Sequence, residues 1–258
     1  MVDVYRQLAQ YPVFTIDEAQ GITGNRKTAY FHLRQLARKG LIQKVRNNIY
    51  SAINPATGQL VASRYQIACA ITASAYLSHH SAFEYYGLAN QVFNEVYVSS
   101  DTRFKAFAFD HVTYRYIASK MNDGVVEARH TTGVRLTDLE RTVIDSIQDV
   151  NKVGGLEELL VCLQGITFLE ETRLIKYLAA YDTQGLYQRT GFLLAQYQQE
   201  LQLSDGFIQF CNDKIGNSTR YLSGGPGQHQ VYVQAWKLMV PAGLFEGAEH
   251  GGVDNAPV

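Results

Sequence analysis

Basic side chains at a helical spacing are the first residues of this chain whose chemistry points to a partner. Lys27, Arg34 and Arg38 recur at intervals of seven and four, so a helix over residues 25–39 would carry them on one face. The opposite stripe is apolar and consists of Ala29, Leu33 and Leu36. A helix with one apolar and one basic face packs on a protein core and offers cations to a polyanion.

The charge of the chain is divided unevenly along its length. Residues 1–53 hold eight Lys or Arg and three acidic side chains, a net charge of +5, although the 258-residue chain carries −1 in total. The remaining 205 residues hold 15 basic and 21 acidic side chains, a net charge of −6. This division indicates that the N-terminal end meets a polyanion and that the rest of the chain does not.

The elements around the basic helix have the order of a winged helix-turn-helix. Short amphipathic helices are expected over residues 2–10 and 16–20, followed by a glycine-containing turn over 21–24. After the basic helix, residues 41–46 and 49–51 read as two strands joined by Asn47-Asn48. In this arrangement the basic helix enters the major groove of DNA and the hairpin, or wing, lies beside it.

The predicted DNA-contacting residues fall into two groups. Those expected to reach base edges are Asn25, Lys27, Thr28 and Arg34. Those expected to contact phosphates are Arg26, Arg38, Lys44 and Arg46. The alternatives are a solvated helix face or a winged helix that binds protein, and the basic hairpin after the basic helix favours DNA.

The sequence predicts an α+β protein in which residues 1–53 form the winged helix-turn-helix. Residues 54–65 are predicted to be a linker, because Asn54-Pro55 and Gly58 are turn-forming. A larger mixed α/β domain is expected over 66–240, helix-rich in its second half, and its predicted elements include helices over 66–75 and 186–203 and a strand over 230–240. The glycine-rich residues 241–258 are expected to form a disordered tail.

Catalytic and metal-binding patterns are weak in this chain, so no catalytic residue, metal ligand or cofactor is predicted. The neighbours His79 and His80 would point about 100° apart on a helix and could not easily share one ion. A nuclease core would need clustered carboxylates and a lysine, and Asp101 with Glu127-Ala128-Arg129 is the nearest match. The three cysteines are scattered singly, as buried thiols of a reduced cytoplasm are.

Two longer motifs carry a resemblance to a known family. They are Tyr76-Leu-Ser-His-His-Ser-Ala-Phe-Glu-Tyr-Tyr-Gly-Leu88 and Arg135-Leu-Thr-Asp-Leu-Glu-Arg-Thr-Val-Ile-Asp145. With the N-terminal module, Gln188-Arg-Thr-Gly-Phe-Leu-Leu194 and the late Trp236-Lys-Leu, the chain up to about residue 240 resembles the AbiEi antitoxin family. The resemblance implies a repressor of its own toxin-antitoxin operon, tied to phage defence, whose C-terminal domain opposes a nucleotidyltransferase toxin.

Six residues of these motifs are candidates for contacting the partner of the C-terminal domain: His80, Glu84, Arg135, Glu140, Arg141 and Asp145. Arg141 and Asp145 are four residues apart and can form an ion pair, so a purely structural role for this helix is the competing interpretation.

Two hypotheses therefore remain open. The first is an antitoxin and repressor without chemistry of its own, which binds operator DNA, expected to contain inverted repeats, and counters the toxin directly or functionally. The second is an enzyme acting on nucleic acid or on the toxin, anchored by the winged helix. For either, the sequence predicts a cytoplasmic protein, because it shows neither a signal peptide nor a run of 18 apolar residues.

Overall fold

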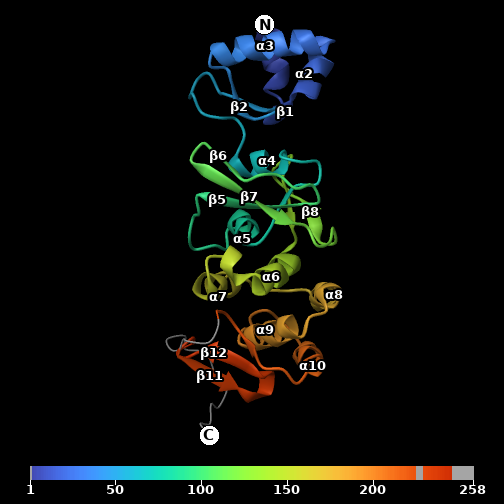
Figure 1. Ribbon diagram of the computed structural model, residues 1–258, viewed down its shortest axis with the longest axis vertical. Helices are drawn as coiled ribbons and strands as arrows, with labels where there is room; N and C mark the ends of the chain where they lie inside the picture. The colour runs from blue at the N-terminus through green and yellow to red at the C-terminus, as the bar shows by residue number, and fades with distance from the viewer. Residues whose placement is uncertain (1, 225–228, 246–258) are drawn as a thin grey trace. The chain divides into compact units, whose positions relative to one another are not determined.

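The computed structural model describes residues 2–224 and 229–245, and they form a mixed α+β protein (Figure 1). The chain divides into two compact units. The first consists of residues 1–82 and 92–138, and the second of residues 83–91 and 139–258. The predicted linker at 54–65 stays a prediction, and most of the predicted tail, from residue 246 on, lies outside the described residues. No helix in the described ranges is long and apolar enough to cross a membrane.

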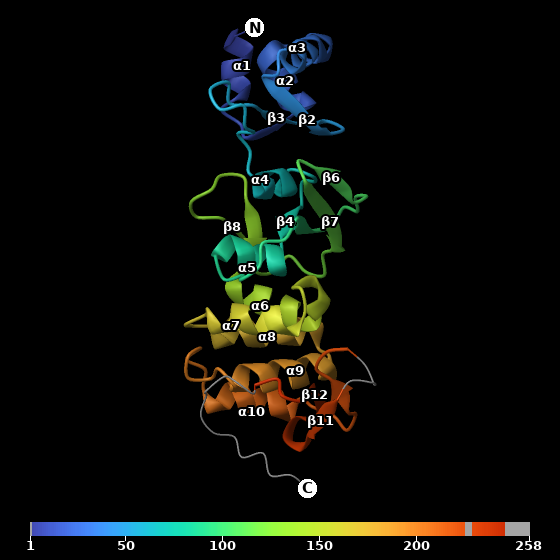
Figure 2. The ribbon, with the colours of Figure 1, turned by 90° about the vertical axis from the view of Figure 1, so that its left-hand side faces the viewer.

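The N-terminal part of the first unit packs three helices on one face of a small antiparallel sheet (Figures 1 and 2). Its elements in chain order are α1 (Val2–Leu8), β1 (Val13–Thr15), α2 (Ile16–Thr23), α3 (Arg26–Arg38), β2 (Ile42–Arg46) and β3 (Ile49–Ala52). Strand β3 lies between β1 and β2, and β1 is a strand that the sequence analysis did not predict. The core between helices and sheet contains Leu8, Phe14, Ile16, Ala19, Ala29, Leu33, Leu36, Ile42 and Ala52.

Local hydrogen bonds fix the corner between α2 and α3. Thr15 and Glu18 form a reciprocal capping box at the start of α2. The helix runs to Thr23 rather than to residue 20, and Gly24 ends it in the left-handed conformation at φ 85°. Asn25 then caps α3 by accepting a hydrogen bond from the backbone N–H of Thr28 at 2.8 Å.

A six-stranded mixed sheet forms the rest of the first unit, in the order β6-β7-β5-β4-β9-β8. Its strands are β4 (Tyr76–Leu77), β5 (Glu95–Ser100), β6 (Phe107–Phe109), β7 (Val112–Ala118), β8 (Val125–Glu127) and β9 (Arg135–Thr137). The pairs β5·β7 and β4·β9 are parallel and the others antiparallel. The helices α4 (Arg64–Cys69) and α5 (His80–Tyr86) precede and follow β4, and α4 is shorter than the predicted helix over 66–75.

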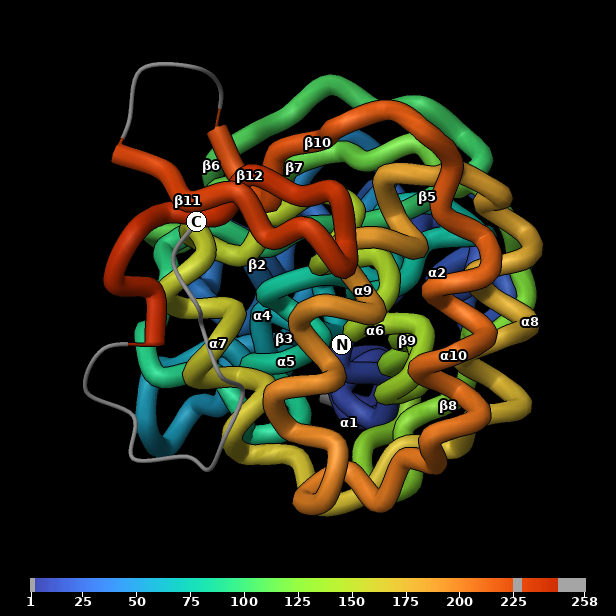
Figure 3. The backbone as a smooth tube through the Cα atoms, turned by 90° about the horizontal axis from the view of Figure 1, so that it is seen from below, coloured from blue at the N-terminus to red at the C-terminus, as the bar shows by residue number. Residues whose placement is uncertain are grey.

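The second unit is helical and ends in a three-stranded sheet of the order β10-β12-β11 (Figure 3). Its helices are α6 (Leu139–Gln148), η1 (Val150–Lys152), α7 (Leu156–Gln164), α8 (Glu171–Tyr181), α9 (Gln184–Ala195) and α10 (Asp205–Asp213). The sheet region contains β10 (Arg220–Tyr221), β11 (Gln230–Val233), η2 (Gln234–Trp236) and β12 (Leu238–Pro241). The helix predicted over 186–203 thus ends at Ala195, and the predicted strand 230–240 is interrupted by η2.

A glycine allows α9 to pack closely against the sheet region. A Cβ atom added at Gly191 would lie 2.1 Å from Cζ3 of Trp236 and 2.9 Å from Cβ of Cys211. The indole of Trp236 is buried and occupies the space that any larger residue at position 191 would need. In the same helix Gly185 has room, because its nearest neighbour would be the Arg220 side chain at 3.7 Å.

This contact predicts a difference between two Gly→Ala substitutions in one helix. Gly191→Ala should lower the free energy of unfolding by about 1–3 kcal/mol, because the added methyl overpacks a filled core. Gly185→Ala is the matched control and should be neutral or raise it by up to about 1 kcal/mol, since alanine favours helix. Urea unfolding followed by circular dichroism measures both, and equal midpoints for the two variants would show that Trp236 does not fill this space.

Candidate nucleic-acid interface

Helix α3 separates an apolar face from a basic one, as predicted. Ala29, Leu33 and Leu36 are buried in the N-terminal core. The exposed face carries Lys27, Arg34 and Arg38, and Lys39 follows at the C-terminal end of the helix. Since 3.6 residues make a turn, positions 27, 34 and 38 follow one another along a single line of the helix surface. The cations can therefore approach one extended anionic partner together.

Two of the predicted DNA contacts are engaged in holding α3 in place. The side-chain oxygen of Asn25 caps the helix, so it is not available to a base edge. Arg26 donates a hydrogen bond from Nη1 to Oδ1 of Asp17 in α2 at 2.5 Å, and this bond raises the pKa of the Arg26 guanidinium. Its guanidinium carbon also lies 5.9 Å from the centre of the Tyr30 ring. Thr28 is half-buried, and its backbone N–H completes the cap.

The hairpin of β2 and β3 presents only one of its two predicted phosphate contacts. Lys44 is exposed, with Nζ 3.3 Å from Oδ1 of Asn47 at the hairpin tip. Arg46 is half-buried, and its guanidinium lies over the rings of Phe107 and Phe104, at 4.7 Å and 5.7 Å from their centres. The guanidinium of Arg46 thus packs on aromatic rings of the same unit, and its contact with phosphate stays a prediction.

A β-bulge explains the orientation of Arg46. The register between β2 and β3 shifts between Lys44 and Arg46, so side chains no longer alternate simply between the two faces. At the tip, Asn48 adopts φ 66° and its Oδ1 accepts a hydrogen bond from the backbone N–H of Ile16 at 3.2 Å. This bond ties the hairpin to the first turn of α2, so the hairpin and the helices form one assembly.

A basic pocket that the sequence analysis did not single out lies near the aromatic rings under Arg46. It is an open hollow of about 560 Å³, lined by Arg103, Phe104, Lys105, Ala106, Arg115 and Tyr116. Arg103 and Lys105 are exposed, whereas Arg115 pairs with Glu95, which lowers the pKa of that carboxyl. The alternation Arg103-Phe104-Lys105 was visible in the sequence as basic side chains interleaved with an aromatic one, which is common at nucleic-acid surfaces.

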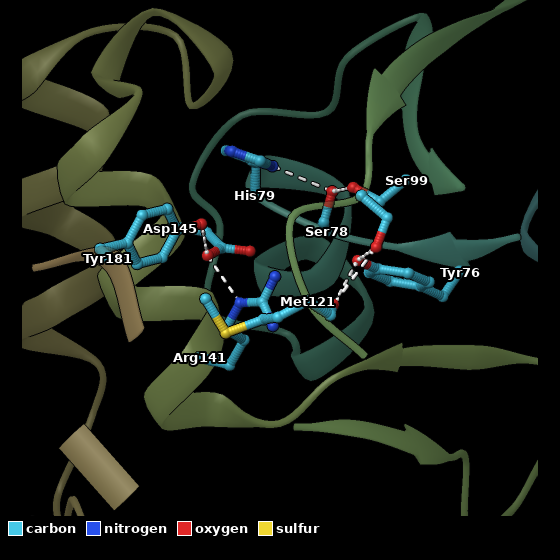
Figure 4. Close-up of polar contacts among 9 residues, drawn as sticks. Tyr76, Ser78, His79, Ser99, Met121, Arg141, Asp145 and Tyr181 are labelled. Carbon is cyan, nitrogen blue, oxygen red and sulfur yellow. Dashed lines mark hydrogen bonds and ion pairs between the residues drawn. The ribbon is translucent and has the colours of Figure 1, made fainter. Parts of the chain in front are cut away.

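The predicted ion pair of the second unit exists and is buried. Nε of Arg141 lies 2.7 Å from Oδ1 of Asp145, and both side chains are at most 3 % exposed (Figure 4). The hydroxyl of Tyr181 in α8 donates a second hydrogen bond to Oδ1 of Asp145 at 2.5 Å. Glu140 is also buried and accepts a hydrogen bond from the backbone N–H of Glu170 at 2.9 Å. These side chains join α6 to neighbouring segments of the unit.

Burial corrects the view that these residues offer a contact surface to a partner. Glu140, Arg141 and Asp145 are 7 %, 2 % and 2 % exposed, so a partner could not reach their charged groups while the helix is in place. His80 is fully buried and its ring stacks on Phe93 at 3.8 Å. Of the six candidates, only Glu84 and Arg135 are partly exposed.

Buried hydroxyl groups are hydrogen-bonded to one another in the first unit, near the start of the motif Tyr76–Leu88. Ser78 is fully buried, and its Oγ lies 2.7 Å from Oγ of Ser99 and 2.9 Å from Nδ1 of His79 (Figure 4). His79 adopts φ 53°, a conformation that non-glycine residues seldom take. Within the described ranges, no group of three or more His, Cys, Asp or Glu side chains is placed to hold a metal ion.

The three cysteines are free thiols and are buried. Burial raises the pKa of Cys69 to about 11, although the backbone of Arg135 offsets part of the effect by hydrogen bonding to the sulfur. Burial also raises the pKa of Cys162 and of Cys211 to about 12. At neutral pH all three are therefore protonated and weakly nucleophilic.

The buried pair predicts a large loss of stability on truncation. Arg141→Ala should lower the free energy of unfolding by about 3–5 kcal/mol, because Asp145 would remain buried without its cation. Arg173→Ala is the matched control: Arg173 pairs with Glu170 at 2.7 Å, but both side chains are nearly half exposed, so the loss should be at most about 1 kcal/mol. Urea unfolding of the full chain checks both values, and a mild effect of Arg141→Ala would show that Asp145 is solvated.

Comparison with known proteins shows the fold and no family. No protein family and no curated protein sequence matches the chain. Among solved structures, the crystal structure of the RV2827C protein from Mycobacterium tuberculosis is similar at a TM-score of 0.64 and 15 % sequence identity. The match covers 92 % of this chain and 89 % of that one, so the two proteins share the fold over nearly their whole length.

Proposed function

We propose that the protein is a DNA-binding transcriptional regulator whose N-terminal module is a winged helix-turn-helix. In this proposal α2 and α3 are the helix-turn-helix, α3 enters the major groove and the β2–β3 hairpin is the wing. The observation that carries the proposal is the basic face of α3, on which Lys27, Arg34 and Arg38 are all exposed beside a hairpin that presents Lys44.

The physics of DNA binding supports this reading of the module. An α-helix fits the major groove, where its exposed side chains reach base edges. Cations that neutralise phosphates release counterions, which gives affinity without sequence preference. Lys27 is exposed in the first turn of α3 and Arg34 about two turns later, and we assign both to base edges. Arg38 and Lys44 are farther along the module and suit phosphates.

Charge elsewhere in the same unit supports a polyanionic partner as well. Arg103 and Lys105 are exposed at the basic pocket, and Phe104 between them contacts Arg46 of the hairpin. Arg103 and Lys105 lie in the same unit as the hairpin. In this proposal they add phosphate contacts to those of α3 and Lys44.

The proposal predicts the behaviour of a double variant of α3. Lys27→Ala/Arg34→Ala in the full chain should weaken binding to a duplex selected from a random pool by about 2–6 kcal/mol, at about 1–3 kcal/mol for each base contact. The slope of affinity against salt should also flatten for each lost charge. Titration by fluorescence anisotropy at several salt concentrations measures both quantities.

The matched control removes two exposed charges from the second unit. Lys214→Ala/Arg220→Ala should leave DNA affinity unchanged, because both residues lie outside the proposed interface. If the Lys27→Ala/Arg34→Ala variant binds DNA with the affinity of the wild type, α3 is not the element that contacts the base edges. Cleavage of the selected duplex on addition of Mg²⁺ would instead favour the alternative of an enzyme anchored by a winged helix.

We further propose that the protein represses its own operon and acts as an antitoxin in the cytoplasm, countering a nucleotidyltransferase toxin. The support is the resemblance of the motifs at Tyr76–Leu88 and Arg135–Asp145 to AbiEi antitoxins. Their first strands, β4 and β9, are neighbours in the six-stranded sheet, where Leu77 pairs with Leu136. The two motifs that carry the resemblance thus begin in strands that pair with each other.

Repression and neutralisation should separate in cells. Lys27→Ala/Arg34→Ala should lose repression of an operator reporter and still protect cells from the nucleotidyltransferase toxin that this proposal pairs with the protein. The reason is that these side chains lie on the surface of the N-terminal module and support no core. Cell survival under toxin induction and reporter activity are measured for the same variant, with Lys214→Ala/Arg220→Ala as control. If the variant loses both repression and protection, neutralisation of the toxin depends on DNA binding.

A further inference from the structure

The basic face of α3 contains one aromatic side chain that nothing in the fold buries. Phe31 is 57 % exposed, more than any other aromatic side chain of the described residues. It lies one turn after Lys27 and nearly one turn before Arg34, on the face opposite the buried stripe of the helix. The ring is therefore exposed on the helix surface between Lys27 and Arg34.

This placement is costly for the free protein. Burying a phenylalanine side chain stabilises a fold, and Phe31 gives up much of that gain because more than half of it is exposed. Phenylalanine is also a weaker helix former than the alanine, lysine, arginine or glutamine found at other exposed positions. A single exposed apolar residue is ordinary on a protein surface, but one in the middle of a basic helix face is informative.

The contacts of Phe31 position its ring without covering it. Its ring lies edge-on to the ring of the next residue, His32, and the two ring centres are 5.7 Å apart. The neighbouring aromatic residue differs, because Tyr30 lies against the guanidinium of Arg26, which Asp17 holds in turn. Tyr30 thus belongs to the corner between α2 and α3, whereas the ring of Phe31 is exposed to solvent.

The chemistry of the major groove offers one apolar feature to such a ring. Among the four bases, only thymine places a methyl group on the groove floor, and phenylalanine is one of the side chains that contact it. Given the proposed function, we infer that Phe31 is a specificity-determining residue that packs on a thymine methyl group in the operator. Lys27 and Arg34 hold the helix in the groove on either side of this contact.

The test removes the methyl group without changing any hydrogen bond of the base pair. A high-affinity duplex is selected from a random pool with the full-length protein, and each dT is replaced singly by dU. Wild-type protein should lose about fourfold in affinity at one or two positions, the value of about 0.8 kcal/mol for one methyl group. Phe31→Ala should bind the dT duplex more weakly and be indifferent to dU at those positions. Tyr11→Ala, which removes an exposed aromatic ring outside α3, should behave as wild type.

The outcomes separate this inference from the function on which it rests. If Phe31→Ala keeps the same sensitivity to dU as wild type, another residue contacts the methyl group and the inference is overturned while DNA binding stands. If the full-length protein enriches no duplex, the proposed function fails and the inference fails with it. Unchanged dU sensitivity together with a shift from dimer to monomer in Phe31→Ala would assign the ring to a contact between two copies of the chain.

Discussion

The hydrogen bond between the side chain of Asn25 and the backbone N–H of Thr28 determines what the N-terminal module presents. This hydrogen bond begins α3 directly after Gly24 has ended α2. Gly24 and Asn25, the two cap residues, therefore form the whole connection between the helices. The capping box of Thr15 fixes the start of α2, and Arg26 fixes the angle by reaching back to Asp17. The directions of Lys27, Phe31 and Arg34 follow from this corner, because a rigid helix carries its side chains as one body.

Much of this module is readable from the sequence because its pattern is dense and local. The spacing of Ala29, Leu33 and Leu36 defines the buried face of α3, and the cations on the other face follow from the same period. The paired asparagines at 47–48 mark the hairpin turn. By contrast, β1, β4 and β9 are only two or three residues long, too short for any alternation to appear, and they form through pairing with distant strands.

Other features of the candidate site depend on tertiary context that no local pattern contains. The bulge in β2 turns Arg46 onto aromatic rings that lie about 60 residues later in the chain. Arg141 and Asp145 have the spacing of a surface ion pair, but both are buried, and Asp145 also accepts a hydrogen bond from Tyr181 of α8. The buried residues Leu194, Tyr197 and Leu201 keep the three- and four-residue spacing of a helix although α9 ends at Ala195, so this periodicity reflects burial and not a continued helix.

The buried thiols have a consequence for how this protein can be controlled. A cysteine senses peroxide or exchanges disulfides through its thiolate, and with pKa values of about 11 and 12 the thiolate fraction at neutral pH is roughly one in ten thousand or less. The folded protein would therefore react slowly with peroxide at each of its three cysteines.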